Sequence, residues 1–350
     1  MQFGIFGSAQ ASSADLGPET GQGFRDYLDM AVEAEALGYR SSFLVEHHFT
    51  GWNQVSATLM LQTALAMRTT KLRLGTAVIV LPWHNPVLLA EQAATLDQIS
   101  GGRFDFGIGK GYRHNEFAGF RIPMEEAEGR FEESVEVMAK AFVSRERFSH
   151  RGRFWQFDDI VVEPPPFQKP QPPFWVAAAS EASIKRAARR GFNLILDQYA
   201  SPEQLGGRIA LFRAERLAAG LPFDRMQVAV ARQMYVADSK AEAEAALKRA
   251  AAATQRTVDV SRTPGRAVAG SHVLSYAGTA GATEAHTLYD TPDSIAAKLG
   301  ALRQAGVAYI LLTTLGGPAQ LRRFAREIMP AFSRGKELRG TTTASESTLV

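Results

Sequence analysis

Short apolar runs alternate with longer amphipathic segments along most of this chain, and this alternation constrains its fold more than any other feature. Strands that are separated by helices pair in parallel, so the pattern predicts repeated β–α units. Runs that are apolar throughout fit such a sheet, because helices cover both of its faces. We expect eight strands, at residues 2–7, 41–46, 72–82, 103–109, 174–179, 192–197, 226–237 and 307–314.

The segments between these runs carry helix signals. The segment 86–100 has a proline at its start and a glycine pair just after its end, which is the usual placement of these two residues around a helix. Eight strands that alternate with helices predict a closed (β/α)8 barrel, the TIM-barrel fold, and a doubly wound open sheet is the alternative. We expect helices at 24–38, 58–68, 86–100, 125–142, 183–191, 202–220, 239–256 and 318–332.

Residues 1–333 are expected to form one barrel domain, followed by a tail. Three segments depart from the alternation. Residues 147–173 contain a proline-rich connection and predict a small inserted hairpin. Residues 257–287 are rich in Gly, Ala, Ser and Thr, and so long a loop in a compact domain is usually a lid or a binding loop. The polar segment 334–350 is expected to be a tail, either disordered or in contact with a partner subunit.

Composition excludes several kinds of site. The chain has no cysteine, so disulfides, zinc–thiolate sites, iron–sulfur clusters and thiol nucleophiles are excluded. Its net charge of +3 gives no argument for nucleic acid or an acidic membrane as a partner. The first residues do not resemble a signal peptide, and no apolar stretch approaches the length of a membrane span. We therefore expect a soluble, cytoplasmic protein.

The carboxyl ends of the strands are where a barrel of this kind gathers its functional residues. Polar residues follow several of the expected strands at this edge. They are Glu46-His47-His48, Trp83-His84-Asn85, Gly109-Lys110-Gly111, Ala179-Ser180-Glu181 and Asp197-Gln198-Tyr199.

The two adjacent histidines at 47 and 48 raise the question of a metal site. Side chains alternate along a strand, so His47 faces the side opposite to Glu46 and His48, and both histidines cannot easily bind one metal. The chain also lacks an H-x-E-x-H spacing, and we predict no metal site. His47 could be a packed residue, but its place at a strand end favours a base or a hydrogen-bonding group at a reaction centre. Glu46 and His48 are expected to be structural.

Two further motifs suit a phosphate group. GIGKG at 107–111 has G-x-G-x-G spacing, which does not match the dinucleotide fingerprint, and it is either a tight turn or a phosphate cradle with Lys110. Ser180 and Ser183 begin a predicted helix, and helix N-termini bind phosphate through their free N–H groups. Ser180 alone would be only an N-cap, but together with Lys110 it predicts a phosphate site. Trp83 and His84 belong either to a wall that stacks on a flat ligand or to a simple turn.

Four motifs in consistent order carry a family resemblance. They are EHHF at 46–49, GTAVIVLP at 75–82, LDQISGGRFDFGIGKG at 96–111 and WVAAASEAS at 175–183. Together they resemble the bacterial luciferase-like flavin-dependent monooxygenases over most of residues 1–330, and they are most similar to the alkanal monooxygenase α-subunit branch.

This resemblance implies a (β/α)8 barrel, usually dimeric, that acts as an oxidoreductase. Enzymes of this family take reduced FMN from a separate NAD(P)H:flavin reductase and use O2 to form a flavin hydroperoxide, which oxygenates an organic substrate. The likeness implies the same cofactor, partner and co-substrate here, with a small and lipophilic compound as the substrate.

The resemblance also assigns residues. His47 takes the place of the family's catalytic histidine, and Ala77-Val78 matches a non-proline cis peptide that lies beside the flavin ring. Lys110 stands where the family has a phosphate-binding arginine, and it preserves the charge but is less suited to bidentate binding. Ser180 and Ser183 match the phosphate site, and we include the adjoining Glu181 in it. Gly109 falls on the position of the reactive cysteine of luciferase and is assigned to the cofactor site.

The departures from the family pattern leave other functions open. Because Gly109 replaces a cysteine, shared chemistry cannot require a thiol, and Val78 replaces an alanine at the flavin face. Residues 257–287 do not align with the family, so the substrate is not fixed by the likeness. The alternatives are a deazaflavin-dependent hydride-transfer enzyme on the same fold, a non-catalytic flavin-binding protein and an open-sheet dehydrogenase.

Overall fold

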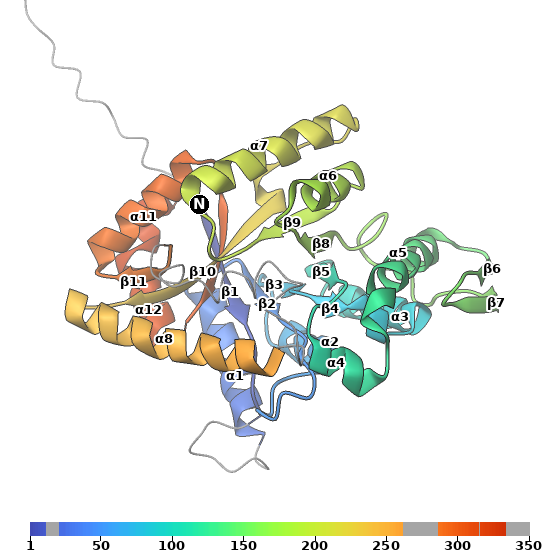
Figure 1. The fold of residues 1–350 in the computed structure, drawn as a ribbon, viewed down its shortest axis with the longest axis horizontal. Helices are drawn as coiled ribbons and strands as arrows, with labels where there is room; N and C mark the ends of the chain where they lie inside the picture. Colours follow the sequence, from blue (N-terminus) through green and yellow to red (C-terminus); the bar gives the residue numbers. More distant parts are fainter. Residues whose placement is uncertain (12–20, 262–285, 315, 334–350) are drawn as a thin grey trace, which may run out of the picture.

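The computed structural model of the chain describes residues 1–11, 21–261, 286–314 and 316–333. Within them, eight parallel strands form a closed ring in chain order, and the last strand pairs with the first. The (β/α)8 barrel is therefore confirmed, and the open sheet is wrong (Figure 1). The ring consists of β1 (Gln2–Gly7), β2 (Ser41–Leu44), β3 (Arg73–Thr76), β5 (Phe104–Gly109), β8 (Phe174–Ala177), β9 (Asn193–Leu196), β10 (Val228–Val236) and β12 (Tyr309–Thr313).

Helices surround this ring and cover its outer face (Figure 1). Their starts follow the capping signals of the sequence: the Asn85 side chain accepts the N–H groups of Val87 and Leu88, and Ser201 forms a capping box with Gln204. The helices are α1 (Gln22–Ala36), α2 (Thr58–Ala66), α3 (Pro86–Ile99), α5 (Ala127–Val143), α6 (Glu181–Arg189), α7 (Pro202–Ala218), α8 (Lys240–Ser261), α11 (Pro292–Gln304) and α12 (Gly317–Glu327).

Several elements differ from the expectations. The expected strand 72–82 is divided into β3, a short β4 (Ile79–Val80) and a 3-10 turn, with a cis peptide bond between Ala77 and Val78. The resemblance had placed a cis bond at this position. A short helix α4 (His114–Phe120), a strand β11 (Leu288–Asp290) beside β10, and α11 were not expected.

Two of the segments set apart in the sequence lie largely outside the described residues. Helix α8 continues to Ser261, so the first residues of the expected lid 257–287 are helical. The rest of that lid up to residue 285, and the tail 334–350, lie outside the described residues, and their roles stay predictions.

The inserted segment holds an antiparallel hairpin, β6 (Phe148–Arg151) and β7 (Gln156–Ile160), at the outer edge of the molecule beside α5 (Figure 1). Glu133 on α5 accepts the backbone N–H groups of Phe154 and Trp155, and its carboxylate also lies 3.3 Å from His150 Nε2. A single carboxylate therefore fixes the tip of the hairpin to the barrel.

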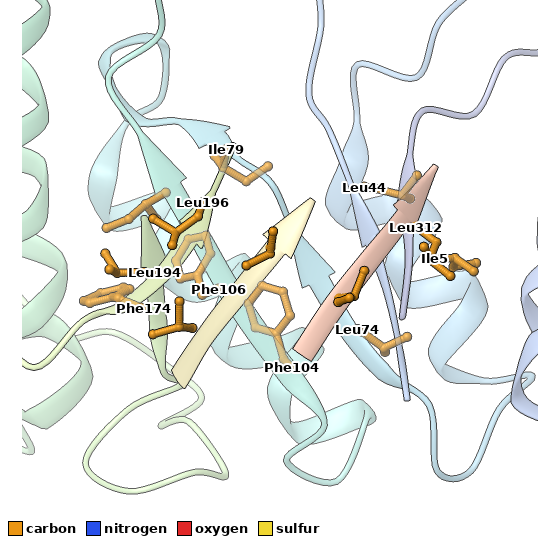
Figure 2. Packing of buried hydrophobic residues seen from close by; sticks show 14 of the residues in the cluster. Ile5, Leu44, Leu74, Ile79, Phe104, Phe106, Phe174, Leu194, Leu196 and Leu312 are labelled. Atoms are coloured by element: carbon orange, nitrogen blue, oxygen red, sulfur yellow. The ribbon is translucent and has the colours of Figure 1, made fainter. Parts of the chain in front are cut away.

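Strand alternation divides the apolar side chains between two cores. The larger core lies between strands and helices, where Ile5 lies beside Leu312 and Phe106 lies beside Phe174 (Figure 2). A second, smaller core fills the inside of the ring and is built from strand residues that alternate with those of the larger core. It consists of Phe43, Trp175, Ile195, Ala229, Tyr309 and Leu311.

The inner core closes the barrel below its carboxyl edge. The Phe43 ring lies over Gly75, where an added Cβ would clash with the ring carbons, and it meets Trp175 edge-on at 5.6 Å. Beneath them, Arg73 forms a bidentate pair with Asp105 at 2.7 and 2.8 Å. The interior is thus a packed core, and open space is left only above it, at the strand ends.

Candidate active site

A cavity of about 790 Å³ opens at the carboxyl ends of the barrel strands. This volume lies within the range of pockets that hold small molecules and cofactors. Its apolar wall consists of Phe6, Ala77, Val78, Ile108, Val176 and Ile195, which come from five different strand ends or the loops that follow them.

His47 follows β2 and lines this cavity. Its Nδ1 lies 3.1 Å from Glu116 Oε1 on α4. An ionised carboxylate can only accept, so Nδ1 carries the hydrogen and Nε2 is left with a free lone pair. Burial lowers the pKa of His47 below its ordinary value, the hydrogen bond to Glu116 opposes this, and the charge of Arg113 adds to the lowering. The imidazole is therefore neutral near pH 7 and can accept a proton at Nε2.

Glu116 is the residue that holds His47, and the sequence analysis did not find it. It is buried, and besides His47 Nδ1 it accepts the backbone N–H of His48 at 2.9 Å. It was missed because the seven-residue helix that carries it was not expected.

The side chains of Glu46 and His48 belong to a different hydrogen-bond network from that of His47, although β2 ends at Leu44 and all three residues lie beyond it. Glu46 Oε1 accepts from His84 Nε2 at 2.7 Å and from His48 Nε2 at 3.1 Å, and Oε2 accepts the N–H of Val80. Burial alone would raise the pKa of Glu46, but these hydrogen bonds outweigh it and hold the pKa below its ordinary value. The carboxylate thus joins the end of β2 to β4 and to the turn that follows it.

Trp83 packs beside this network and away from the cavity. Its ring stacks on Phe120 at 5.3 Å and meets Phe117 and His48 edge-on. It is not one of the residues that line the cavity, so the turn is the better interpretation of this motif.

The opposite end of the cavity is positively charged and includes the start of α6. Ser180 is the N-cap of α6, and its Oγ accepts the N–H of Ser183 at 3.3 Å. Lys110 Nζ lies 2.7 Å from Glu128 Oε2, and Arg186 Nη1 lies 3.0 Å from Glu128 Oε1. Two cations and a helix N-terminus therefore converge here, with one carboxylate between the cations.

Seven of the eight residues expected at the site line this one cavity. They are His47, Ala77, Val78, Gly109, Lys110, Ser180 and Ser183, and their roles stay predictions. At Gly109 an added Cβ would lie 2.5 Å from Val78 Cγ2, so glycine is needed for the two loops to lie this close. Glu181 does not line the cavity, and its carboxylate pairs with Lys185 on the surface of α6.

Five charged residues at the cavity were missed: Arg113, Glu116, Glu128, Arg186 and Arg190. Arg186 could have been found, because it follows Ser183 by three residues on a helix and therefore lies on the same face. Among the described residues, no group of three or more His, Asp or Glu side chains is arranged to hold a metal ion. In the same part of the chain, no helix has the length and apolarity needed to span a bilayer.

Comparisons with known proteins agree with this geometry. The chain is 28% identical over 228 residues to the oxygenase component of the flavin-dependent trigonelline monooxygenase of Acinetobacter baylyi, covering 64% of this chain and 62% of that protein. It is 28% identical over 193 residues to the alkanal monooxygenase alpha chain of the Kryptophanaron alfredi symbiont, covering 55% of this chain and 54% of that one. The chain thus matches less than two thirds of the length of these curated relatives.

Solved structures share the fold over nearly the whole chain. Monooxygenase RslO1 from Streptomyces bottropensis superimposes with a TM-score of 0.79 and 26% identity, covering 95% of this chain and all of that one. An F420-dependent secondary alcohol dehydrogenase superimposes with a TM-score of 0.74 and 20% identity, covering 95% of this chain and 99% of that one. A model of the family described as luciferase-like monooxygenase matches residues 1–324. The chain therefore belongs to the luciferase-like monooxygenase family.

Proposed function

We propose that this protein is a monooxygenase that uses reduced FMN and O2 to oxygenate a small organic substrate. The observation that carries the proposal is the combination, in one cavity, of a neutral histidine at one side and an anion-binding helix start at the other. A flavin phosphate needs the second feature, and proton transfer at the reaction centre needs the first.

The residues of the cavity fit FMN. The apolar wall of Ala77, Val78 and Ile108 suits a flat ring system, and the donors of Lys110 and of the α6 N-terminus suit a phosphate. When bound and reduced, FMN would supply the electrons that activate O2. Family relatives described as flavin-dependent support this choice of cofactor.

The chain's own residues would position the reactants and move a proton. His47 can take or return a proton at Nε2, since its Nδ1–H is held by Glu116. Glu116 in turn is fixed to the backbone of His48, so the ring cannot rotate freely. The apolar wall would exclude water from the reacting atoms, which strengthens electrostatic interactions there.

Two partners belong to the proposal. The trigonelline relative is described as an oxygenase component, which supports a separate reductase as the source of reduced flavin. Exposed apolar side chains on the neighbouring helices α2 and α3 support a dimer of the chain. Met60 lies on α2, Met67 directly follows it, and Leu88 and Ile99 lie on α3. Such a patch favours protein–protein contact.

A labelling experiment tests the reaction. Supplied with reduced FMN by a generic flavin reductase, under 18O2, and offered a panel of lipophilic compounds, the protein should place one 18O atom in a product. Incorporation of 16O from water, or product formation without O2, would contradict oxygenation. His47→Ala should lower turnover by about 10²–10⁴-fold, the usual contribution of a general acid or base.

The deazaflavin alternative is favoured by one observation, the fold likeness to F420-dependent enzymes. It is tested by anaerobic titration of the protein with reduced FMN and with reduced F420. We expect FMN to bind more tightly, and tighter binding of F420 with O2-independent turnover would replace the monooxygenase proposal. Binding of flavin without any turnover would favour a non-catalytic protein.

A further inference from the structure

Arg113 is the most poorly satisfied charged residue that lines the cavity. Only 3% of it is exposed, and it follows β5 as the N-cap of α4. A guanidinium group carries five N–H donors and stays charged at any physiological pH. Two of its nitrogens, Nε and Nη1, are buried and have no acceptor in the described part of the chain.

The neighbours of Arg113 do not supply hydrogen-bond acceptors for these two nitrogens. The nearest carboxylate oxygen, Glu116 Oε1, lies 4.0 Å from Nη1, which is beyond hydrogen-bond distance. That oxygen already accepts from His47 Nδ1 and from the backbone N–H of His48. The ring of Tyr112 also lies beside it, with its centre 5.8 Å from the guanidinium carbon.

Other buried arginines of the same barrel are well satisfied. Arg73 forms a bidentate pair with Asp105, and Arg232 donates to the carbonyl oxygens of Asp197, Ala200 and Ala231 at 2.6–3.0 Å. Neither of these arginines lines the cavity, whereas Arg113 does. The fold can therefore satisfy a buried guanidinium from within, but the described residues do not do so for Arg113, which borders the cavity.

We propose that Arg113 binds an anionic oxygen group, a carboxylate by preference, on the organic substrate. A carboxylate matches the fork of a guanidinium and can accept two of its N–H groups at once. His47 and Arg113 both lie against Glu116, so a substrate anchored on Arg113 is held beside the histidine. The substrate class is thus an organic anion with an apolar body, since the cavity wall is largely apolar.

The phosphate end of the cavity is a separate site. Lys110 and Arg186 are already paired with Glu128, and the inference about Arg113 uses neither of them. The inference rests on the proposed function only where it calls the bound anion the substrate. Its test therefore begins without flavin.

The test compares matched acids and amides. The full chain without flavin is titrated with benzoate and benzamide, and with octanoate and octanamide, by calorimetry. The wild type should bind each carboxylate at least about tenfold more tightly than its amide, as expected for a hydrogen-bonded charge pair. In Arg113→Met this preference should disappear while amide binding is retained, and in Arg113→Lys it should be reduced.

Arg121→Met is the matched control. It removes the same charge from an exposed position at the other end of α4 and should leave the preference unchanged. Equal binding of acid and amide by the wild type, or a preference that survives in Arg113→Met, would overturn the proposal. If Arg113→Met does not fold, as judged by circular dichroism, the wild type and Arg113→Lys decide the matter alone.

A second titration separates the substrate from the flavin. Arg113→Met should bind reduced FMN as the wild type does, and a loss of FMN affinity equal to the loss of carboxylate preference would assign Arg113 to the flavin and refute the proposal. A wild-type protein that prefers carboxylates but binds no flavin would instead refute the proposed function and leave the anion site standing.

Discussion

At the scale of residues, His47 depends on a partner that lies 69 positions further along the chain. Alternation at a strand end was the reason to prefer His47 to His48, and the two side chains do have different partners, Glu116 and Glu46. It was not sufficient to find Glu116 or Arg113. Both lie on or next to a seven-residue helix that begins without a side-chain cap, so the local sequence carries little signal for it.

Glu116→Gln tests the hydrogen bond that fixes the tautomer of His47. Because the carboxylate raises the pKa of His47 against the effect of burial, its loss should lower that pKa further. The imidazole pKa, followed by nitrogen-detected NMR, should fall in the variant, and turnover should fall with it. An unchanged pKa would show that Glu116 does not control the ring.

The lowered pKa of His47 also predicts how stability depends on pH. The unfolded chain binds a proton near the ordinary value of 6.5, and the folded chain binds it only at lower pH. The contribution of His47 to stability is therefore fully present above pH 6.5 and is lost as the pH falls toward the folded value. Urea unfolding of the wild type and of His47→Gln should show a weaker acid dependence in the variant; equal slopes would contradict this.

Glu128→Gln tests the phosphate end of the cavity. The hydrogen bond from Lys110 lowers the pKa of Glu128, burial opposes this, and the charges of Lys110 and Arg186 add to the lowering, so the ionised carboxylate would compete with the proposed phosphate for both cations. The variant should bind FMN several-fold more tightly and riboflavin unchanged.

Lys110→Ala is the converse variant and should weaken FMN more than riboflavin, because riboflavin lacks the phosphate. Fluorescence quenching of the flavin measures the affinities of the wild type and of both variants for FMN and for riboflavin. Equal changes for the two flavins would remove Glu128 and Lys110 from the phosphate site.

At the scale of elements, most strands and helices could be predicted, because the spacing of apolar residues and the residues at helix ends indicate the same boundaries. The expected strand 72–82 is divided after Thr76, and the pattern of side chains along the segment gives no sign of this. Strand β11 has only three residues, which is too short for a period to be visible. Helix α11 did carry a signal, a proline in its first turn after Thr291.

Phe43→Ala tests the inner core that closes the barrel. The ring is fully buried over Gly75, and its removal leaves a cavity that the neighbouring strands cannot fill. The free energy of unfolding should fall by about 3–5 kcal/mol in urea denaturation. Phe167→Ala removes the same ring from an exposed loop and should change stability little; a similar loss in both variants would argue against the role of the inner core.

At the scale of the whole molecule, the barrel was predictable because eight repeated units leave few other arrangements. The proposed dimer is tested on the exposed methionines of α2. Met60→Glu with Met67→Glu places two charges among these apolar side chains, and light scattering should then report a monomer, whereas we expect a dimer for the wild type. Leu217→Glu adds a charge at an equally apolar position on α7 and should leave the mass unchanged.

The attachment of Glu116 to both His47 and the backbone of His48 has a consequence for engineering the chain toward new substrates. Inserting or deleting one residue ahead of Glu116 in α4 would turn its side chain by about 100° around the helix axis and separate His47 from its support. Libraries are better made of substitutions at Tyr112 and Tyr199, which border the cavity and leave the length of α4 unchanged. Diversity introduced there can reshape the cavity while the His47–Glu116 pair is inherited intact.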